Sequence, residues 1–468
     1  MSPSRTPHRA SPREIAQTEP FAPQPGRLKL LPRLPVDRVL ISWAFRKRVH
    51  SFLRSSLWVV PAFSTLAAFL SVPLLRDLDR RLGFQFLRYS PDGARALASI
   101  VSAAMLSFVV LFFSVLLLTV QIASSSLSPR IISRPFRSRA LKASLGLFVF
   151  TLIYSMAVVA RGIDGNIGQL ATAMVIVLTV ISICVFLYVV EHVSKELRPV
   201  TVMAAIAEEA IGVIRAVYPN MLEPSSGIDN QLDESSLGVP SRVVLHVGTS
   251  GVVQAVDIAT LAELATRAAC TIEVVPQVGD FVASDDAVFR LYGDSSGISS
   301  KQLLRHILLE RERTLEQDPA FAFRIIVDIA SKALSPAIND PTTAVLALDQ
   351  IHNLLRDVGM RRLDTGLVRD SSGQLRVFYR TPDWEDFVRL AVTEIRQFGG
   401  NSTQVVRRMR AMLEQLIPLL SPYRASVLRQ ELDLLKFTTN QGFAMLEDRE
   451  RAELPDFQGL GGRRKKLS

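Results

Sequence analysis

Polar residues in the second half of the chain have the side-chain types that a binding site would need. Six of them lie in or near the string SPAINDP (335–341): Arg313, Gln317, Asp318, Asp328, Asn339 and Asp340. Carboxylate and amide oxygens are the ligands that Mg²⁺ and Ca²⁺ prefer, and a guanidinium group binds anions through parallel hydrogen bonds. This set predicts either a metal or anion site, or a buried hydrogen-bond network that joins three helices.

Helix capping explains part of this set without a ligand. Asp318, Asp340 and Ser421 each precede a proline, and a short oxygen-bearing side chain followed by proline is typical of the beginning of a helix. We therefore expect helices to begin at residues 319, 341 and 422. On the first of them, Arg324 lies four residues before Asp328, so the two side chains should pair.

Motifs for other kinds of chemistry are missing from the sequence. It contains no HExxH zinc motif, no GxxxxGK phosphate loop and no GxSxG nucleophile elbow. The two cysteines, Cys184 and Cys270, do not form a CxxC pair. We therefore assign no catalytic residue, expect no cofactor, and expect neither a disulfide nor a zinc site to organise the fold.

The elements that must position the polar set follow a strongly apolar region. Four uncharged runs are each long enough to cross a hydrocarbon core of ~30 Å at ~1.5 Å per helical residue: Ser55–Leu75, Ala96–Pro129, Ala143–Ala160 and Gly165–Val190. No Asp, Glu, Lys, Arg or His lies inside them, which counts against an ion-coupled transporter. On the second run, the small residues Ser99, Ala103 and Ser107 predict a face that packs closely against another helix.

Charge is concentrated at the two ends of the chain. Of the net charge of +10, residues 1–56 carry +8 and the last twelve residues carry +4. Such arms suit an anionic lipid surface better than a nucleic acid, whose binding domains carry basic residues on a folded face. The alternative is that both arms are disordered tails that keep the protein soluble.

The flanks of the runs predict an orientation. Basic residues precede the first run, and residues 130–142 hold five basic residues and no acid. The positive-inside rule then places both termini in the cytoplasm, with four spans in the membrane. The segment 76–95 is discordant, because it holds five Arg and three Asp on the outer side. We expect no cleaved signal peptide.

The rest of the chain predicts a cytoplasmic α+β domain. Two-residue alternation and β-branched content predict strands in a small α/β module, at Arg242–Val247, Val252–Asp257, Thr271–Gln277 and Ala287–Tyr292. The first two should flank a turn at 248–251, and a helix should begin after Asp257. From residue 299 the period predicts a helical core, which includes a helix that ends before Asp318 and a β-hairpin that turns at 370–373.

These patterns together predict an integral membrane four-helix α bundle followed by a cytoplasmic α+β domain. The expected divisions are a disordered basic arm (1–35), the membrane domain (36–198), a helix and polar linker (199–236), the α/β module (237–296), the mainly helical domain (297–450) and a disordered basic tail (451–468).

The string from 310 to 351, ERERTLEQDPAFAFRIIVDIASKALSPAINDPTTAVLALDQI, together with QIASSSLSPR (121–130), carries a family resemblance. It resembles a bacterial family of predicted membrane proteins known as domain of unknown function 2254. The resemblance extends over residues 36 to about 450. The resemblance implies that the protein lies in the inner (plasma) membrane of a bacterium and has four N-terminal spans followed by a cytoplasmic core. It implies no catalytic residue, because the family has no established activity.

Three functions are compatible with the sequence. We expect a non-enzymatic sensor or scaffold that couples a cytoplasmic ligand or partner to the four spans. The first alternative is an oligomeric channel, and the second is a metal-dependent membrane enzyme at the SPAINDP corner. We expect the lipid bilayer as a partner, with anionic lipid at the basic arms, and a homo-oligomer. We expect no nucleic acid, and the sequence does not identify a protein partner.

Overall fold

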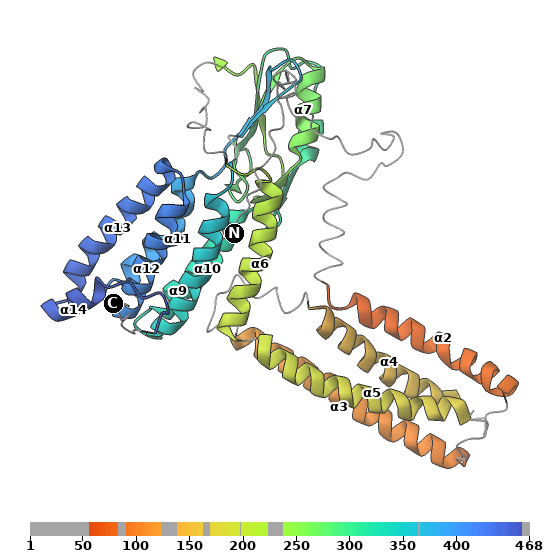
Figure 1. Cartoon of the computed structure of the whole chain (residues 1–468). Coiled ribbons are helices and arrows are strands. Elements are labelled where there is room, and N and C mark those ends of the chain that lie inside the picture. The colour runs from red at the N-terminus through yellow and green to blue at the C-terminus, as the bar shows by residue number, and fades with distance from the viewer. Residues whose placement is uncertain are drawn as a thin grey trace, which may run out of the picture. The chain divides into compact units, whose positions relative to one another are not determined.

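The computed structural model describes residues 56–82, 90–122, 138–161, 169–196, 198–222, 237–363 and 366–460 (Figure 1). Its first part contains four helices that are long and apolar enough to cross a membrane: α2 (Val59–Leu82), α3 (Pro91–Ile122), α4 (Arg139–Arg161) and α5 (Gln169–Glu196). They overlap the four apolar runs of the sequence, so the prediction of four candidate spans is confirmed. The basic arm 1–35 lies outside the described residues.

Helix α4 is the central member of this bundle, because it packs against α2, α3 and α5. Its Phe148 and Tyr154 are fully buried, and hydroxyl groups join it to neighbouring helices. The Thr151 hydroxyl lies 3.1 Å from the Ser182 hydroxyl, and Ser102 donates a hydrogen bond of 2.8 Å to Ser155. Each of these polar groups is thereby satisfied inside an apolar bundle, as a membrane interior requires.

The packing face of α3 differs from the one that the sequence predicts. Ser99, Ala103 and Ser107 are exposed in this chain, so the prediction that they pack within the bundle is wrong. The residues of α3 that are buried lie on another face of the helix, which faces the rest of the bundle: Ala94, Ala98, Val101, Met105, Phe112, Leu116 and Thr119.

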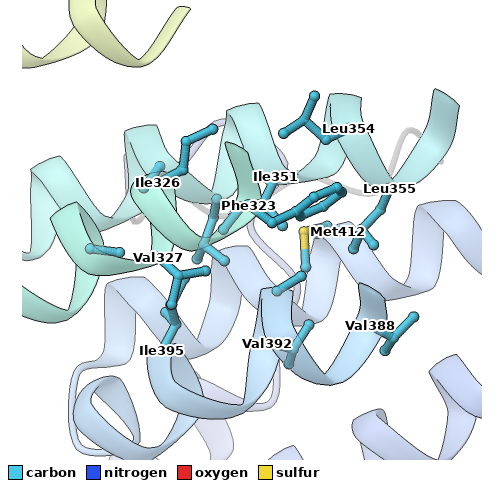
Figure 2. Packing of buried hydrophobic residues seen from close by; sticks show 14 of the residues in the cluster. Phe323, Ile326, Val327, Ile351, Leu354, Leu355, Val388, Val392, Ile395 and Met412 are labelled. Carbon is cyan, nitrogen blue, oxygen red and sulfur yellow. The ribbon is translucent and has the colours of Figure 1, made fainter. Parts of the chain in front are cut away.

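The second part of the chain is a helical body with one continuous apolar core. It consists of α6 (Pro199–Val217), α9 (Pro319–Ala333), α10 (Pro341–Gly359), α11 (Trp384–Gly399), α12 (Thr403–Leu416), η7 (Ile417–Leu419), α13 (Pro422–Gly442) and α14 (Leu446–Ala452). Helix α9 is buried almost all round, and its Phe323 lies among Ile351, Leu355 and Met412 in Figure 2. This packing provides the rigid frame for the polar residues on α9 and at its two ends.

Several helices begin where the sequence predicts, and the reason is local. The Asp257 carboxylate accepts a hydrogen bond from Thr260 N at 3.3 Å at the start of α7 (Ile258–Arg267). Asp383 and Asp386 form a reciprocal capping box at the start of α11. Ser421 is the exception, since it makes no side-chain capping bond to α13. Pro422, at the first turn of α13, lacks the amide that helix starts leave unpaired.

Two β-sheets complete the fold. The first has five strands in the order β1 (Arg242–Leu245), β5 (Ala287–Tyr292), β3 (Thr271–Val274), β8 (Leu375–Tyr379) and β7 (Leu367–Arg369). The second has three strands in the order β4 (Phe281–Val282), β2 (Gly251–Val256) and β6 (Ile307–Glu310). All neighbours are antiparallel except β3 and β8, which are parallel. The 367–379 hairpin, grouped with the helical region by sequence, thus shares a sheet with residues 242–292.

The strands on either side of 248–251 are not paired with each other: β1 pairs with β5, while β2 pairs with β4 and β6. One expectation about this region is wrong. The helix expected from residue 299 to Asp318 is only α8 (Ser300–Leu303) and the 3₁₀ turn η6 (Leu304–His306), followed by strand β6. Leu308 and Leu309 pair with residues of β2 in an antiparallel ladder. This pairing outweighs the spacing of the apolar residues in the sequence, which also fits a helix.

The end of the chain is more ordered than its composition predicts. Residues 451–460, expected to belong to a disordered tail, pack onto α12. Arg407 donates to the Leu454 carbonyl at 2.9 Å, and Gln404 donates to the Gly459 carbonyl at 2.7 Å. Residues 461–468, which hold the basic cluster, lie outside the described residues.

Candidate functional site

The six polar residues singled out by sequence lie in three separate places. Arg313, Gln317 and Asp318 precede the first residue of α9, Asp328 lies on it, and Asn339 and Asp340 follow its last residue. Helix α9 has 15 residues, so its ends are ~22 Å apart at ~1.5 Å per residue. The structure therefore does not gather the six into one site, and each group has its own geometry.

The SPAINDP corner turns the chain from α9 into α10. Both carboxylate oxygens of Asp340 are used at the start of α10, since Thr343 N donates to Oδ1 at 3.1 Å and Thr343 Oγ1 donates to Oδ2 at 2.5 Å. Asp340 N donates to Ala333 O at 2.7 Å, and Asn339 N to Ser335 O at 2.8 Å. Residues 336–339 are exposed, so this corner is a surface turn and not part of a buried network.

Asn339 has a role that the sequence analysis missed. Its φ is +48°, in the left-handed region where asparagine and glycine are tolerated and most residues are strained. An asparagine directly before an Asp-Pro helix start was the available signal, because Asn is enriched at such positions.

We expect Asn339→Val to lower the free energy of unfolding by ~1–2 kcal/mol, since a β-branched side chain is strained at positive φ. Asn339→Gly should change it by less than ~0.5 kcal/mol, because glycine adopts this conformation freely. The midpoint of thermal unfolding of the full chain in detergent measures both. Equal losses in the two variants would mean that the asparagine side chain itself, and not the backbone conformation, is needed.

Asp328 belongs to an ion cluster that joins two helices. Arg324 Nε donates to Asp328 Oδ1 at 2.6 Å, which confirms the predicted pair. The same guanidinium group also binds Glu394 of α11 through two bonds, of 2.5 and 2.6 Å. The bonds to Glu394 and to Asp328 raise the pKa of Arg324 above its usual range. Glu394 lies 70 residues away in the chain, and no local pattern could have indicated it.

The third group lies in the segment 311–318, between β6 and α9, which we call the joint. Arg313 Nε donates to Asp318 Oδ2 at 2.5 Å, while Phe321 N donates to Asp318 Oδ1 at 3.0 Å. The guanidinium carbon of Arg313 also lies 5.3 Å from the centre of the Phe321 ring. The Asp318 side chain is only 4% exposed, so this carboxylate depends on Arg313 for its charge compensation.

The joint is bound on its other side to the smaller β-sheet. Gln317 Oε1 accepts from Val256 N at 3.1 Å, and Gln254 Nε2 donates to the Glu312 carbonyl at 2.7 Å. Gly279, with φ of +96°, lies against Arg313, and a Cβ atom there would be 2.3 Å from the guanidinium carbon. A side chain here would have to displace the guanidinium group, and the positive φ also favours glycine at this turn. The joint thus connects β2 and the 277–280 turn to the first residue of α9.

Burial is the largest effect on the Asp318 carboxyl group and raises its pKa. Hydrogen bonding and charge from Arg313 oppose this shift, and the nearby carboxylate of Asp280 adds to it. Each oxygen of Asp318 has one donor, so the pair has the geometry of a structural clamp. Within the described ranges, no group of three His, Cys, Asp or Glu residues is placed to hold a metal ion.

Buried arginines near the end of α10 form a second clamp, which sequence reasoning missed. Arg424 Nη1 donates to the carbonyls of Gly359 at 2.9 Å and Arg361 at 2.8 Å. Arg361 Nη1 in turn donates to Tyr218 O, just after α6, at 2.9 Å. These bonds satisfy carbonyls that helix ends leave unpaired. They also join α6 to α10 and α13.

His352 on α10 lies in a third polar cluster, with Asp349 and Arg408. Arg408 Nε donates to Asp349 Oδ1 at 2.6 Å, and Arg408 Nη2 lies 3.3 Å from His352 Nδ1. Burial, then the positive charges of Arg408 and Arg356, lower the pKa of His352 to about 4. His352 is therefore neutral in the folded protein near pH 7.

The free energy of unfolding should fall as the pH is lowered from ~6.5 to ~4, because the pKa of His352 is lower in the folded chain than in the unfolded chain. Between pH ~6.5 and ~4 the unfolded chain binds a proton at His352 that the folded chain does not, so the unfolded state is favoured by acid. Solvent screening of this half-buried group limits the effect to ~1 kcal/mol. Thermal unfolding midpoints at pH 7.5 and pH 5 measure it. His352→Gln should reduce the difference between the two midpoints, and an unchanged difference would assign the acid sensitivity to other groups.

Comparison with known proteins gives one family. The family described as predicted membrane protein (DUF2254) matches residues 54–415. The chain belongs to this family. Members similar to it include uncharacterised proteins of Mycobacterium bovis and Mycobacterium tuberculosis strain H37Rv. Each is 27% identical over 420 residues, which cover 86% of this chain and 80% of the relative. No solved structure matches this chain.

Membership in the DUF2254 family agrees with the candidate spans, and the chain is a membrane protein with a mixed helical and sheet region after the spans. Both mycobacterial relatives are uncharacterised. Residue roles in this chain therefore come from its own geometry. The matched range includes the joint, the SPAINDP corner and all four candidate spans.

Proposed function

We propose that this DUF2254 protein is a non-enzymatic sensor or scaffold in the bacterial plasma membrane, with both termini in the cytoplasm. It couples a cytoplasmic ligand or partner to the four-span bundle. The distribution of basic residues supports this orientation, because residues 1–56 and 130–142 are both strongly basic. The geometry of the polar groups supports a non-enzymatic role, since their oxygens are occupied in caps and ion pairs.

One observation carries the proposal: helix α6 is both the continuation of the last span and a part of the cytoplasmic core. Only residues 197 and 198 separate the end of α5 from Pro199. The face of α6 that contains Met203, Ile206 and Ile214 is fully or almost fully buried against α9 and α10. A shift in this core therefore moves α6. The segment that connects α5 to α6 has almost no slack, so the movement of α6 is passed on to α5.

The joint provides a path into this core from the β-sheets. Gln317 receives a hydrogen bond from β2, and Asp318 caps α9. Helix α9 packs on α6 along the same core. A ligand that changed the position of β2 or of the 277–280 turn would thus act on α9 directly, through short contacts.

A ligand screen on the full chain in detergent tests the sensing part. Divalent ions, nucleotides and phospholipid headgroups are added separately, and the unfolding midpoint is measured. A ligand at ~100 times its Kd should add ~2.7 kcal/mol to the free energy of unfolding. The absence of a shift with every compound, and of co-purifying protein, would contradict a sensor or scaffold.

An insertion tests the coupling part. Gly-Ser-Gly-Ser placed between Leu197 and Arg198 gives α6 slack without altering the core. With bound ligand, hydrogen exchange in the last turns of α5 should change in the natural chain and stay constant in the insertion variant, while ligand affinity is equal in both. An equal change in both would mean that coupling does not pass through α6.

A further inference from the structure

The start of α6 is connected to the last candidate span by a short stretch of chain. The last apolar run of the sequence ends at Val190, and α5 continues to Glu196. These extra turns rise ~9 Å at ~1.5 Å per residue, which is close to the ~5–8 Å depth of one headgroup layer. Residues 197 and 198 span at most ~10 Å more. The first turn of α6 is therefore held near the headgroups at any angle between α5 and α6.

Helices α9 and α10 meet at this same end. Helices α6 and α10 have 19 residues each and pack together. The segments after their last residues are joined, since Arg361 Nη1 donates to Tyr218 O at 2.9 Å and Leu222 N donates to Met360 O at 2.9 Å. The two helices are therefore parallel, and Pro341 lies at the end where Pro199 lies. The bond from Asp340 N to Ala333 O brings the last residue of α9 to this end as well.

The ends of α11 and α13 complete this surface. A Cβ atom on Gly399, the last residue of α11, would be 3.1 Å from Leu334 Cδ1, next to the end of α9. One on Gly442, the last residue of α13, would be 2.6 Å from the Gly400 carbonyl. Figure 1 shows α14 and the start of α6 at the same, lower end of the helical part.

Large apolar side chains project from this end into solvent. Five of them, which we call the apolar end, are exposed: Ile338 43%, Phe398 51%, Phe437 62%, Met445 66% and Leu446 66%. Exposed apolar residues that are scattered singly over a surface are normal. Several of them on neighbouring helix ends are typical of an interaction surface. One of them, Ile338, belongs to the SPAINDP corner.

We propose that the apolar end docks onto the headgroup layer of the membrane that holds α5. The length of chain between α5 and α6 keeps this surface near the bilayer, so docking is intramolecular and benefits from a high effective concentration. Apolar side chains at a helix end insert into the boundary between headgroups and acyl chains. The corner of α9 and α10 thereby gains a function: the positive φ of Asn339 closes a turn that leaves Ile338 exposed.

Charge near this surface favours an anionic bilayer over a second protein. Residues 461–468, which follow the described residue Leu460 in the chain, include four basic residues and no acid. Basic clusters of this kind are attracted to an anionic lipid surface. Helix α14 also carries exposed Glu447 and Glu450, which oppose binding to an anionic bilayer. The apolar contact therefore provides most of the affinity for the bilayer, and the basic residues add a contribution that depends on salt.

Site-specific fluorescence on the full chain in vesicles tests the docking. Bimane is attached at Ile338→Cys or Leu446→Cys, in a background with Cys184→Ser and Cys270→Ala. Leu419→Cys is the control, because Leu419 is 44% exposed and lies beside Leu420, which contacts Gly359 at the opposite end of α10. The vesicles contain phosphatidylethanolamine with or without phosphatidylglycerol. Nitroxide lipid and aqueous iodide are the two quenchers.

Docking predicts strong quenching by nitroxide lipid and weak quenching by iodide at positions 338 and 446, with the reverse at 419. Adding Ile338→Glu to the chain labelled at 446 should abolish its lipid quenching, while Leu419→Glu should leave it unchanged. Removing residues 461–468 should abolish only the increase caused by phosphatidylglycerol.

Two results would overturn the proposal. Quenching by iodide at 338 and 446 equal to that at 419 would place the apolar end in water. Protection from both quenchers would show that protein covers it, either a second copy of this chain or another segment. Neither result bears on the proposed function, because the ligand screen tests sensing and the insertion between Leu197 and Arg198 tests coupling independently of docking.

Discussion

Arg313→Met is expected to lower the free energy of unfolding by ~3–5 kcal/mol, because it leaves a buried carboxylate without its partner. Asp318 is 4% exposed, and among the described residues Arg313 is the cation that pairs with it. Methionine keeps much of the side-chain volume beside Phe321, so the loss reports the charge and not a cavity. The thermal unfolding midpoint of the full chain in detergent measures it.

The pH dependence of this variant identifies the cause. Without Arg313, only the hydrogen bond from Phe321 N still opposes burial, so the pKa of Asp318 rises further. The folded chain then binds a proton more readily than the unfolded chain, so stability increases as the pH falls from neutrality towards the unfolded pKa of ~3.9. The deficit relative to the natural chain should be largest at pH 7 and smaller at pH 5.

Two controls make the test specific. Arg311→Met removes an exposed charge two residues away and should change stability by less than ~0.5 kcal/mol. Asp318→Asn in the Arg313→Met background should restore part of the loss, since asparagine is neutral and still caps a helix. If the double variant is no more stable than Arg313→Met, the buried charge is not what Arg313 compensates.

Arg424→Met is expected to cost ~3–4 kcal/mol, the second of the two large effects, because it leaves buried carbonyl groups unpaired. Arg424 is 5% exposed, and its Nη1 atom donates to Gly359 O and Arg361 O. Its guanidinium carbon also lies 5.6 Å from the centre of the Trp384 ring. Methionine can fill this space but cannot donate to either carbonyl.

Arg429→Met on the same helix is the matched control, because Arg429 is exposed. It should leave the free energy of unfolding within ~0.5 kcal/mol of that of the natural chain. Limited proteolysis adds a local readout, since weaker bonds at the end of α10 should also increase cleavage near Tyr218. A loss below ~1 kcal/mol for Arg424→Met would mean that water replaces its hydrogen bonds.

Local signals in the sequence determined the elements that depend on neighbours in the chain. The four apolar runs predicted four candidate spans because crossing a bilayer requires length and apolarity only. Asp257, Asp318 and Asp340 cap helices as expected, since a cap bonds to an amide three residues away. The Arg324 and Asp328 pair was predictable for the same reason, as residues four apart face each other on a helix.

Tertiary structure decided the features that depend on distant partners. Residues 307–310 form a strand because β2 offers an open edge more than 50 residues earlier in the chain, although their apolar period also fits a helix. Glu394, Arg361 and Arg424 were missed because their partners come from other elements. The six polar residues look like one site in the sequence, but α9 holds them apart.

The sequence by itself thus determined the four candidate membrane spans, most helix starts and the family to which the chain belongs. It did not determine which polar residues meet, how the strands pair or which apolar residues remain exposed. The physical reason is the range of the interactions. Caps and helix periods depend on a few consecutive residues, whereas the joint, the buried arginines and the apolar end exist only when segments far apart in the chain are packed together.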